Sequence, residues 1–252
     1  MQINKPKDNQ LRLQMHMPPV YDYGAWIRHA GVEDACNRLA LWSVHGSNIW
    51  LASEASAGKT HLLHTFTVEQ PSVVILDAFS DINTDSNAHT NTNHSWQLAQ
   101  QWMESFHGYD RWLIDVPADD IEQAVALALF HILERARDLQ CAVVIAWRGE
   151  IGNLPPELSS RLLSMEKIDM SPPADDDVLL QILRSSAGNL QWDIREQVLQ
   201  AMLTYLPRRL DVLVAALNAL ETISFEQKHK PGPAWVKQQL MRIADQLQPS
   251  LR

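Results

Sequence analysis

Cysteine is scarce in this 252-residue sequence, which contains only Cys36 and Cys141. These two residues lie far apart and lack metal-ligand spacing, so a cytosolic protein with reduced thiols is the simpler interpretation. Long apolar runs are also missing, since no stretch approaches the roughly 20 residues that a membrane-spanning helix needs. The first ten residues are polar and have no signal-peptide core. We therefore expect a cytoplasmic protein with no membrane partner.

Positive charge is in deficit, because 21 Lys and Arg residues face 30 Asp and Glu residues and give a formal net charge of -9. Duplex-binding proteins usually present a basic surface, since phosphate contacts release counterions and supply much of the affinity. No long run of Lys and Arg compensates for the deficit. The charge therefore argues against an autonomous DNA-binding domain, although a local basic patch stays compatible with it.

Hydrophobic residues make up 46% of the chain, enough for a substantial core. Short apolar runs typical of buried parallel strands occur at 49–52, 73–76, 112–114 and 142–146. Helical patterns between them lie at about 60–67, 96–106 and 120–138. Strands that alternate with helices predict an α/β core with a parallel sheet covered on both faces.

The remaining segments have a different character. Residues 1–19 are predicted to be a flexible arm that ends in two prolines, and 20–171 to be the α/β core. Within the core, the polar segment 80–95 predicts a structureless loop. Strand signals vanish from 172 onward, so 172–252 is predicted to be a separate helical domain. Its helical patterns lie at about 174–186, 192–206, 209–225 and 233–247.

The sharpest local signal is a phosphate-loop motif between the first apolar run and the first helix. Strand, tight loop and helix are the context in which such a motif gains meaning. The predicted phosphate-binding residues are Ser56, Ala57, Gly58, Lys59, Thr60 and His61. Backbone N–H groups would attract phosphate, Lys59 would reach its terminal groups and Thr60 could bind Mg²⁺. The motif normally has a further glycine where Ser53 stands, and the alternative is an ordinary helix start capped near Ser56.

A second element supports the motif. The apolar run before Asp115 ends in that carboxylate, as a strand that holds Mg²⁺ through water requires. The next residue is Val116, where an active ATPase has a second acid that orients the attacking water. The alternative is that Asp115 merely caps the following turn.

Four segments together resemble the DnaA/Hda family of AAA+ proteins. They are 58–64 (GKTHLLH), 113–115 (LID), 154–162 (LPPELSSRL) and 206–213 (LPRRLDVL). The resemblance covers about residues 20–247 at low identity, in the right order and spacing. It implies an AAA+ P-loop core followed by a small all-helical lid domain. It also implies ADP or ATP with Mg²⁺ as cofactor.

The resemblance assigns roles to two arginines. Arg161 would be an arginine finger that acts in trans on the nucleotide of a neighbouring DnaA-type initiator, and Arg208 would be the sensor 2 arginine that contacts nucleotide. The alternative for Arg161 is a surface residue paired with a carboxylate such as Glu157, and the alternative for Arg208 is a solvated residue at a helix start. Asp211 would point away from any bound phosphate.

The arm carries a segment similar to the sliding-clamp-binding motif of Hda-type members, formed by Gln10, Leu11, Leu13 and Met15. In an extended peptide the apolar side chains share one side and can fill a groove while the glutamine makes an amide contact. A short edge strand that packs on its own domain is the alternative. No segment resembles the C-terminal DNA reader of initiators, which together with the acidic charge favours the Hda branch.

Three positions depart from the family and argue against intrinsic ATP hydrolysis: Ser53, Val116 and Trp147, the last where a small polar residue is usual. They leave open ADP binding, weak binding or an empty pocket. The predicted function is a regulator that docks on the clamp and promotes hydrolysis of initiator-bound ATP. The alternatives are a nucleotide-free scaffold that recruits another replication or repair protein, and a slow ATPase with loader activity. The oligomeric state, homo-oligomers included, stays open.

Overall fold

The computed structural model describes residues 26–42, 46–69, 72–77, 92–228 and 231–247. These residues form two compact units: Arg28–Pro173, and a second unit from Ala174 onward to which Trp26 and Ile27 are also assigned. The arm residues Gln10, Leu11, Leu13 and Met15 lie outside the described residues, as does most of the predicted loop at 80–95.

The first unit is built on a five-stranded sheet in the order β2-β3-β4-β1-β5, in which every neighbouring pair is parallel. The strands are β1 (Ile49–Ala52), β2 (Val73–Asp77), β3 (Arg111–Asp115), β4 (Ala142–Ala146) and β5 (Glu166–Asp169). The first four coincide with the predicted apolar runs, so the predicted parallel sheet is confirmed. β5 was not predicted, because it lies at an edge and buries only Ile168 of its four residues. Arg38 pairs with Glu166 of this strand at 2.7 Å and holds the pKa of the carboxyl at about 2.

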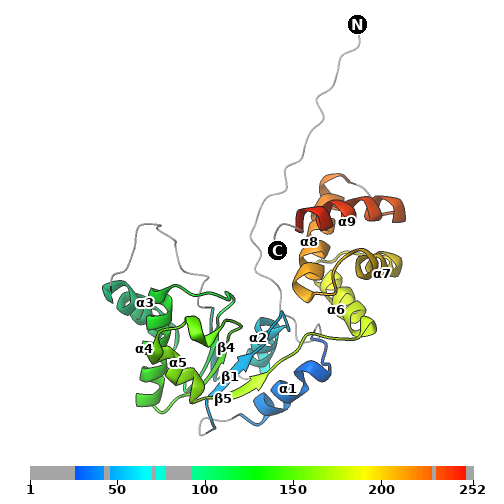
Figure 1. Cartoon of the computed structure of the whole chain (residues 1–252). Helices are drawn as coiled ribbons and strands as arrows, with labels where there is room; N and C mark the ends of the chain where they lie inside the picture. Colours follow the sequence, from blue (N-terminus) through cyan, green and yellow to red (C-terminus); the bar gives the residue numbers. More distant parts are fainter. Residues whose placement is uncertain (1–25, 43–45, 70–71, 78–91, 229–230, 248–252) are drawn as a thin grey trace. The chain divides into compact units, whose positions relative to one another are not determined.

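Both faces of the sheet are covered by helices. Successive strand residues point to opposite faces, and in the central strands β1 and β4 both sets are buried. On one face, α3 (Thr92–Ser105) and α4 (Gln123–Asp138) lie side by side and enclose the largest apolar cluster (Figure 1). The helices α1 (Glu33–Ala40) and α2 (Lys59–Glu69) also contact the sheet, at β5 and at β2 and β3 respectively.

Two helices differ from the prediction. α3 begins at Thr92, so the loop predicted at 80–95 is wrong over its last four residues. The reason is that Ser95 is buried and Leu98, Ala99 and Trp102 follow at helical spacing, which extends the packed face toward the N-terminus. α5 (Pro156–Leu163) was not predicted as a helix; it has proline at its first position and buries Leu158 and Leu162, one turn apart.

The second unit is helical, as predicted. Its elements are α6 (Asp176–Asn189), α7 (Glu196–Tyr205), α8 (Leu210–Glu226) and α9 (Pro233–Leu247). They enclose an apolar core of their own, which includes Leu183, Met202 and Leu217. The carboxylate of Asp175 caps the start of α6 by accepting a hydrogen bond from the Asp177 amide at 2.9 Å. None of the helices in the described ranges is long and apolar enough to cross a lipid bilayer.

Candidate functional site

The phosphate-loop motif forms the connection between β1 and α2. Gly58 has a φ of +81°, a backbone conformation that residues with a Cβ rarely adopt. α2 begins at the next residue, Lys59, and the Leu62 amide donates to the Gly58 carbonyl at 2.9 Å. Ser56 therefore lies before the helix rather than at its cap. The loop brings the predicted residues to a helix N-terminus, where unpaired backbone N–H groups and the helix dipole attract anions.

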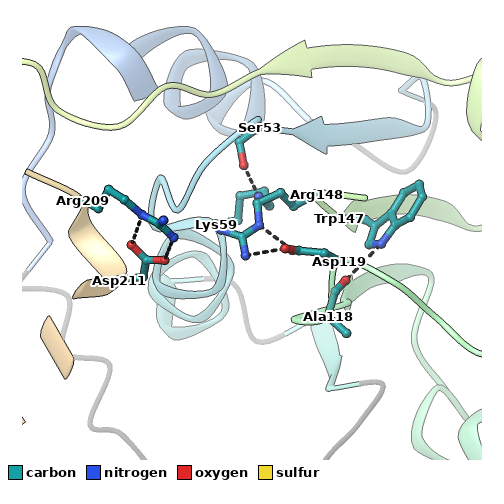
Figure 2. A network of polar contacts seen from close by, with 8 residues as sticks. All are labelled: Ser53, Lys59, Ala118, Asp119, Trp147, Arg148, Arg209 and Asp211. Carbon is teal, nitrogen blue, oxygen red and sulfur yellow. Dashed lines mark hydrogen bonds and ion pairs between the residues drawn. The ribbon is translucent and has the colours of Figure 1, made fainter. Parts of the chain in front are cut away.

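Lys59 points from the start of α2 toward the loop that precedes it (Figure 2). Its half-buried ammonium group donates a hydrogen bond to the hydroxyl of Ser53, which occupies the place of the missing glycine. Burial, reinforced by the positive charge of Arg148, lowers the pKa of Lys59 to about 8, and the carboxylates of Asp115 and Asp119 partly offset the shift. Lys59 is therefore mainly charged at neutral pH, and its ammonium group has the Ser53 hydroxyl as a hydrogen-bond acceptor.

Asp115 ends β3 and is only 2% exposed. The hydroxyl of Thr60 and the carboxylate of Asp115 are the oxygen donors that Mg²⁺ prefers, so this donor set fits the ion. Among the residues that the structure describes, no three or more His, Cys, Asp or Glu side chains gather as metal ligands.

Val116 and Trp147, the two positions at which the resemblance implies polar groups that support hydrolysis, are apolar and buried. Val116 is buried, and its amide donates to the Ala146 carbonyl at 2.9 Å. Trp147 is 2% exposed, stacks on Trp50 with ring centroids 6.4 Å apart, and donates its indole N–H to the Ala118 carbonyl at 3.1 Å (Figure 2). Neither side chain can orient a water molecule for attack on phosphate.

An ion pair joins the loop after β4 to the loop after β3. Arg148 forms a two-pronged ion pair with Asp119, in which Nη2 lies 2.8 Å from Oδ2 (Figure 2). A Cβ on Gly149 would lie 1.9 Å from the Asp119 carbonyl oxygen and 2.1 Å from a ring carbon of Trp147, so only glycine fits there. No local sequence pattern predicted the Arg148–Asp119 pair, because the two residues lie 29 positions apart.

Arg161 lies on α5, where its Nε contacts Oε1 of Glu134 on α4. The other carboxylate oxygen of Glu134 lies 2.8 Å from Nη2 of Arg137. Arg161 is thus paired with a carboxylate, as the alternative interpretation stated, but the partner is Glu134 on α4 and not Glu157 on its own helix, because α5 packs against α4. The Arg161 side chain remains 35% exposed, which leaves it accessible from solvent.

Within the helical unit, Arg208 forms a two-pronged ion pair with Asp176, with distances of 2.7 and 2.9 Å. The pairing raises the pKa of Arg208 and lowers that of Asp176. Arg209 pairs with Asp211 at 2.7 Å (Figure 2). Both pairs are solvent-exposed, so each contributes little to folding stability.

No protein-family model matches the chain. Among solved structures, domain III of the replication initiation protein DnaA from Thermotoga maritima is similar, with a TM-score of 0.67, 18% identity, and coverage of 90% of this chain and 98% of that one. AMPPCP-bound DnaA from Aquifex aeolicus has a TM-score of 0.56 and 15% identity over 84% of this chain and 68% of that one. The Thermotoga maritima RuvB Holliday junction branch migration motor has a TM-score of 0.55 and 12% identity over 88% and 70%.

These similarities establish the fold. The chain has the same fold as these proteins, a parallel sheet covered by helices and followed by a helical region; the sequence predicted this arrangement, although not the fifth strand.

Proposed function

We propose that this chain is a replication-related AAA+ regulator that binds a nucleotide without rapid turnover and acts on a partner ATPase. The observation that carries the proposal is the combination at one sheet edge of a loop with the lysine and threonine of a phosphate-binding motif and two apolar residues at the positions where catalytic groups would be expected. Lys59 and buried Asp115 are close enough for their charges to interact, whereas Val116 and Trp147 are apolar and enclosed. Such a site can hold a nucleotide but lacks the groups that activate water.

The nucleotide would be ADP or ATP, held by the loop residues 56–61, with Thr60 and Asp115 as ligands of Mg²⁺. The bound ion would neutralise phosphate charge. The likeness to AMPPCP-bound DnaA supports nucleotide as the ligand class.

The partner would be a DnaA-type initiator, on whose bound ATP Arg161 acts in trans. A guanidinium is suited to this because it is always charged and presents several N–H donors to developing negative charge. Docking on the sliding clamp through Gln10, Leu11, Leu13 and Met15 would bring the regulator to DNA-loaded clamps. The chain would need no DNA-binding domain of its own, in agreement with its net charge of -9.

Titration calorimetry with ADP tests the nucleotide site. We expect wild-type protein to bind ADP and Lys59→Ala to bind about a hundredfold more weakly, since a charged hydrogen-bond donor to phosphate is lost. Alanine favours the helix, so α2 and the circular dichroism spectrum should be unchanged. ATP should bind without turnover. Wild-type protein that binds no ADP up to millimolar concentration would refute the nucleotide site.

The ADP affinity should fall as the pH rises above about 8. Below the Lys59 pKa of about 8 the ammonium is charged and ready for phosphate, and above it binding must first take up a proton. The expected limit is about a tenfold loss of affinity per pH unit. Calorimetry at pH 7 and pH 9 in buffers of different ionisation enthalpy would detect the proton uptake. The Lys59→Arg side chain stays charged, so the ADP affinity of this variant should no longer depend on pH in this range. If its affinity falls with pH as that of the wild type does, another group is responsible for the titration.

A second candidate is a nucleotide-free scaffold that recruits another replication or repair protein to the clamp. One observation favours it: the ammonium group of Lys59 already donates a hydrogen bond to the hydroxyl of Ser53. Absence of ADP binding in wild-type protein together with retained clamp binding would select this candidate. Turnover that is lost in Lys59→Ala would instead select a slow ATPase.

A further inference from the structure

We propose that Arg148 is a second phosphate-binding cation of this site, released from Asp119 when nucleotide binds. The inference rests on the proposed nucleotide site and names a residue that the sequence motifs do not include. Trp147 stands where a small polar residue is usual, and its neighbour Arg148 would supply a charged group that recognises the polyphosphate instead.

The first argument is topological. β1, β3 and β4 are neighbours and run parallel, so their carboxyl ends meet at one edge of the sheet. The loop before Lys59 follows β1, Asp119 follows β3 and Arg148 follows β4. In open α/β sheets, ligands bind at this edge, beyond the carboxyl ends of the strands. Arg148 therefore shares the edge at which the phosphate loop begins.

The second argument is the charge balance at this edge. The positive charge of Arg148 lies near enough to Lys59 to lower its pKa, while Asp115 and Asp119 act in the opposite direction. Two neighbouring cations repel each other, and a polyphosphate bound beside them would relieve that repulsion. A guanidinium binds phosphate oxygens with the same two-pronged geometry that it uses here on a carboxylate.

The third argument is that the backbone of Arg148 is fixed while its ion pair is replaceable. Trp147 is buried on one side, and Gly149 lies against the Asp119 carbonyl on the other. The carboxylate of Asp119 is 54% exposed, and an ion pair in such a position contributes little net stability. Exchange of this carboxylate for a phosphate group thus needs no movement of the backbone.

The test is a double-mutant cycle of ATP and ADP affinity, measured by calorimetry at pH 7. Arg148→Ala should weaken binding by about tenfold, the effect of one lost charge-assisted contact at a partly exposed site. Asp119→Asn should strengthen binding by about threefold, because it frees the guanidinium. In Arg148→Ala/Asp119→Asn the gain should disappear. Arg148→Lys, which keeps the charge without the fork, should be intermediate.

The two single variants break the same ion pair, so a purely structural role for it would change the affinity in the same direction in both. That result would overturn the inference, as would an affinity unchanged by Arg148→Ala. If the gain in affinity from Asp119→Asn persisted in the double variant, it would come from the removal of negative charge alone. That result would overturn the proposed exchange of Asp119 for phosphate at Arg148. In all these cases wild-type protein binds nucleotide and Lys59→Ala binds it about a hundredfold more weakly. Failure of the proposed nucleotide site is different, because wild-type protein itself would then not bind.

Discussion

Arg161→Ala is expected to abolish the stimulation of ATP hydrolysis by a DnaA-type partner while leaving clamp binding unchanged. An arginine finger supplied in trans contributes about 10³- to 10⁵-fold to the hydrolysis rate, so its removal should return the partner to its unstimulated rate. The measurement is phosphate release by the ATP-bound initiator in the presence of DNA-loaded clamp. Clamp binding by the variant is followed separately, because we propose that it depends on the arm residues Gln10, Leu11, Leu13 and Met15.

Arg137→Ala is the matched control for this experiment. Arg137 and Arg161 both contact Glu134, one from α4 and the other from α5. If stimulation were lost because the Glu134 carboxylate lacked one of its two cationic partners, both variants would lose stimulation. A finger role requires that only Arg161→Ala loses it. Stimulation by Arg161→Ala equal to that of the wild type would refute the finger assignment.

Trp147→Ala should reduce the free energy of unfolding of the first unit by about 3–5 kcal/mol, the usual cost of replacing a large buried aromatic by alanine. The indole is 2% exposed, stacks on Trp50 and donates a hydrogen bond to the Ala118 carbonyl, so the substitution leaves both a cavity and an unpaired acceptor. Native-state hydrogen exchange of the β1 and β4 amides measures the loss, since core strands exchange through unfolding of the whole unit.

Trp96→Ala provides the comparison. Trp96 lies on α3 and is 53% exposed, with its ring edge-on to His131 at 5.1 Å. The same substitution there removes far less buried surface, and we expect a loss below about 1 kcal/mol. Equal losses in the two variants would show that Trp147 is no more important to the core than a surface tryptophan.

The sequence by itself determined the parallel sheet of the first unit, the helical character of the second, and the place of the tight loop before Lys59. Buried strands of a parallel sheet are short continuous apolar runs, so β1 to β4 could be located from residues adjacent in the chain. The loop before Lys59 could be located for the same reason, since glycine, lysine and threonine act within one turn of the backbone. The departures at Val116 and Trp147 are likewise local, because each follows the end of a predicted strand.

The tertiary structure decided what lies far apart in the chain. β5 is an edge strand with one buried residue, so no apolar run marks it. The start of α3 depends on packing against α4, which overrides the polar composition of residues 92–95. Arg161 pairs with Glu134 and not with Glu157, because the approach of two helices brings them together. Arg148 and Asp119 meet because parallel strands end at one edge of the sheet. Local patterns reflect backbone periodicity and can be found in a short stretch of sequence. Ion pairs between distant elements depend on how those elements pack, and a short stretch of sequence does not contain that information.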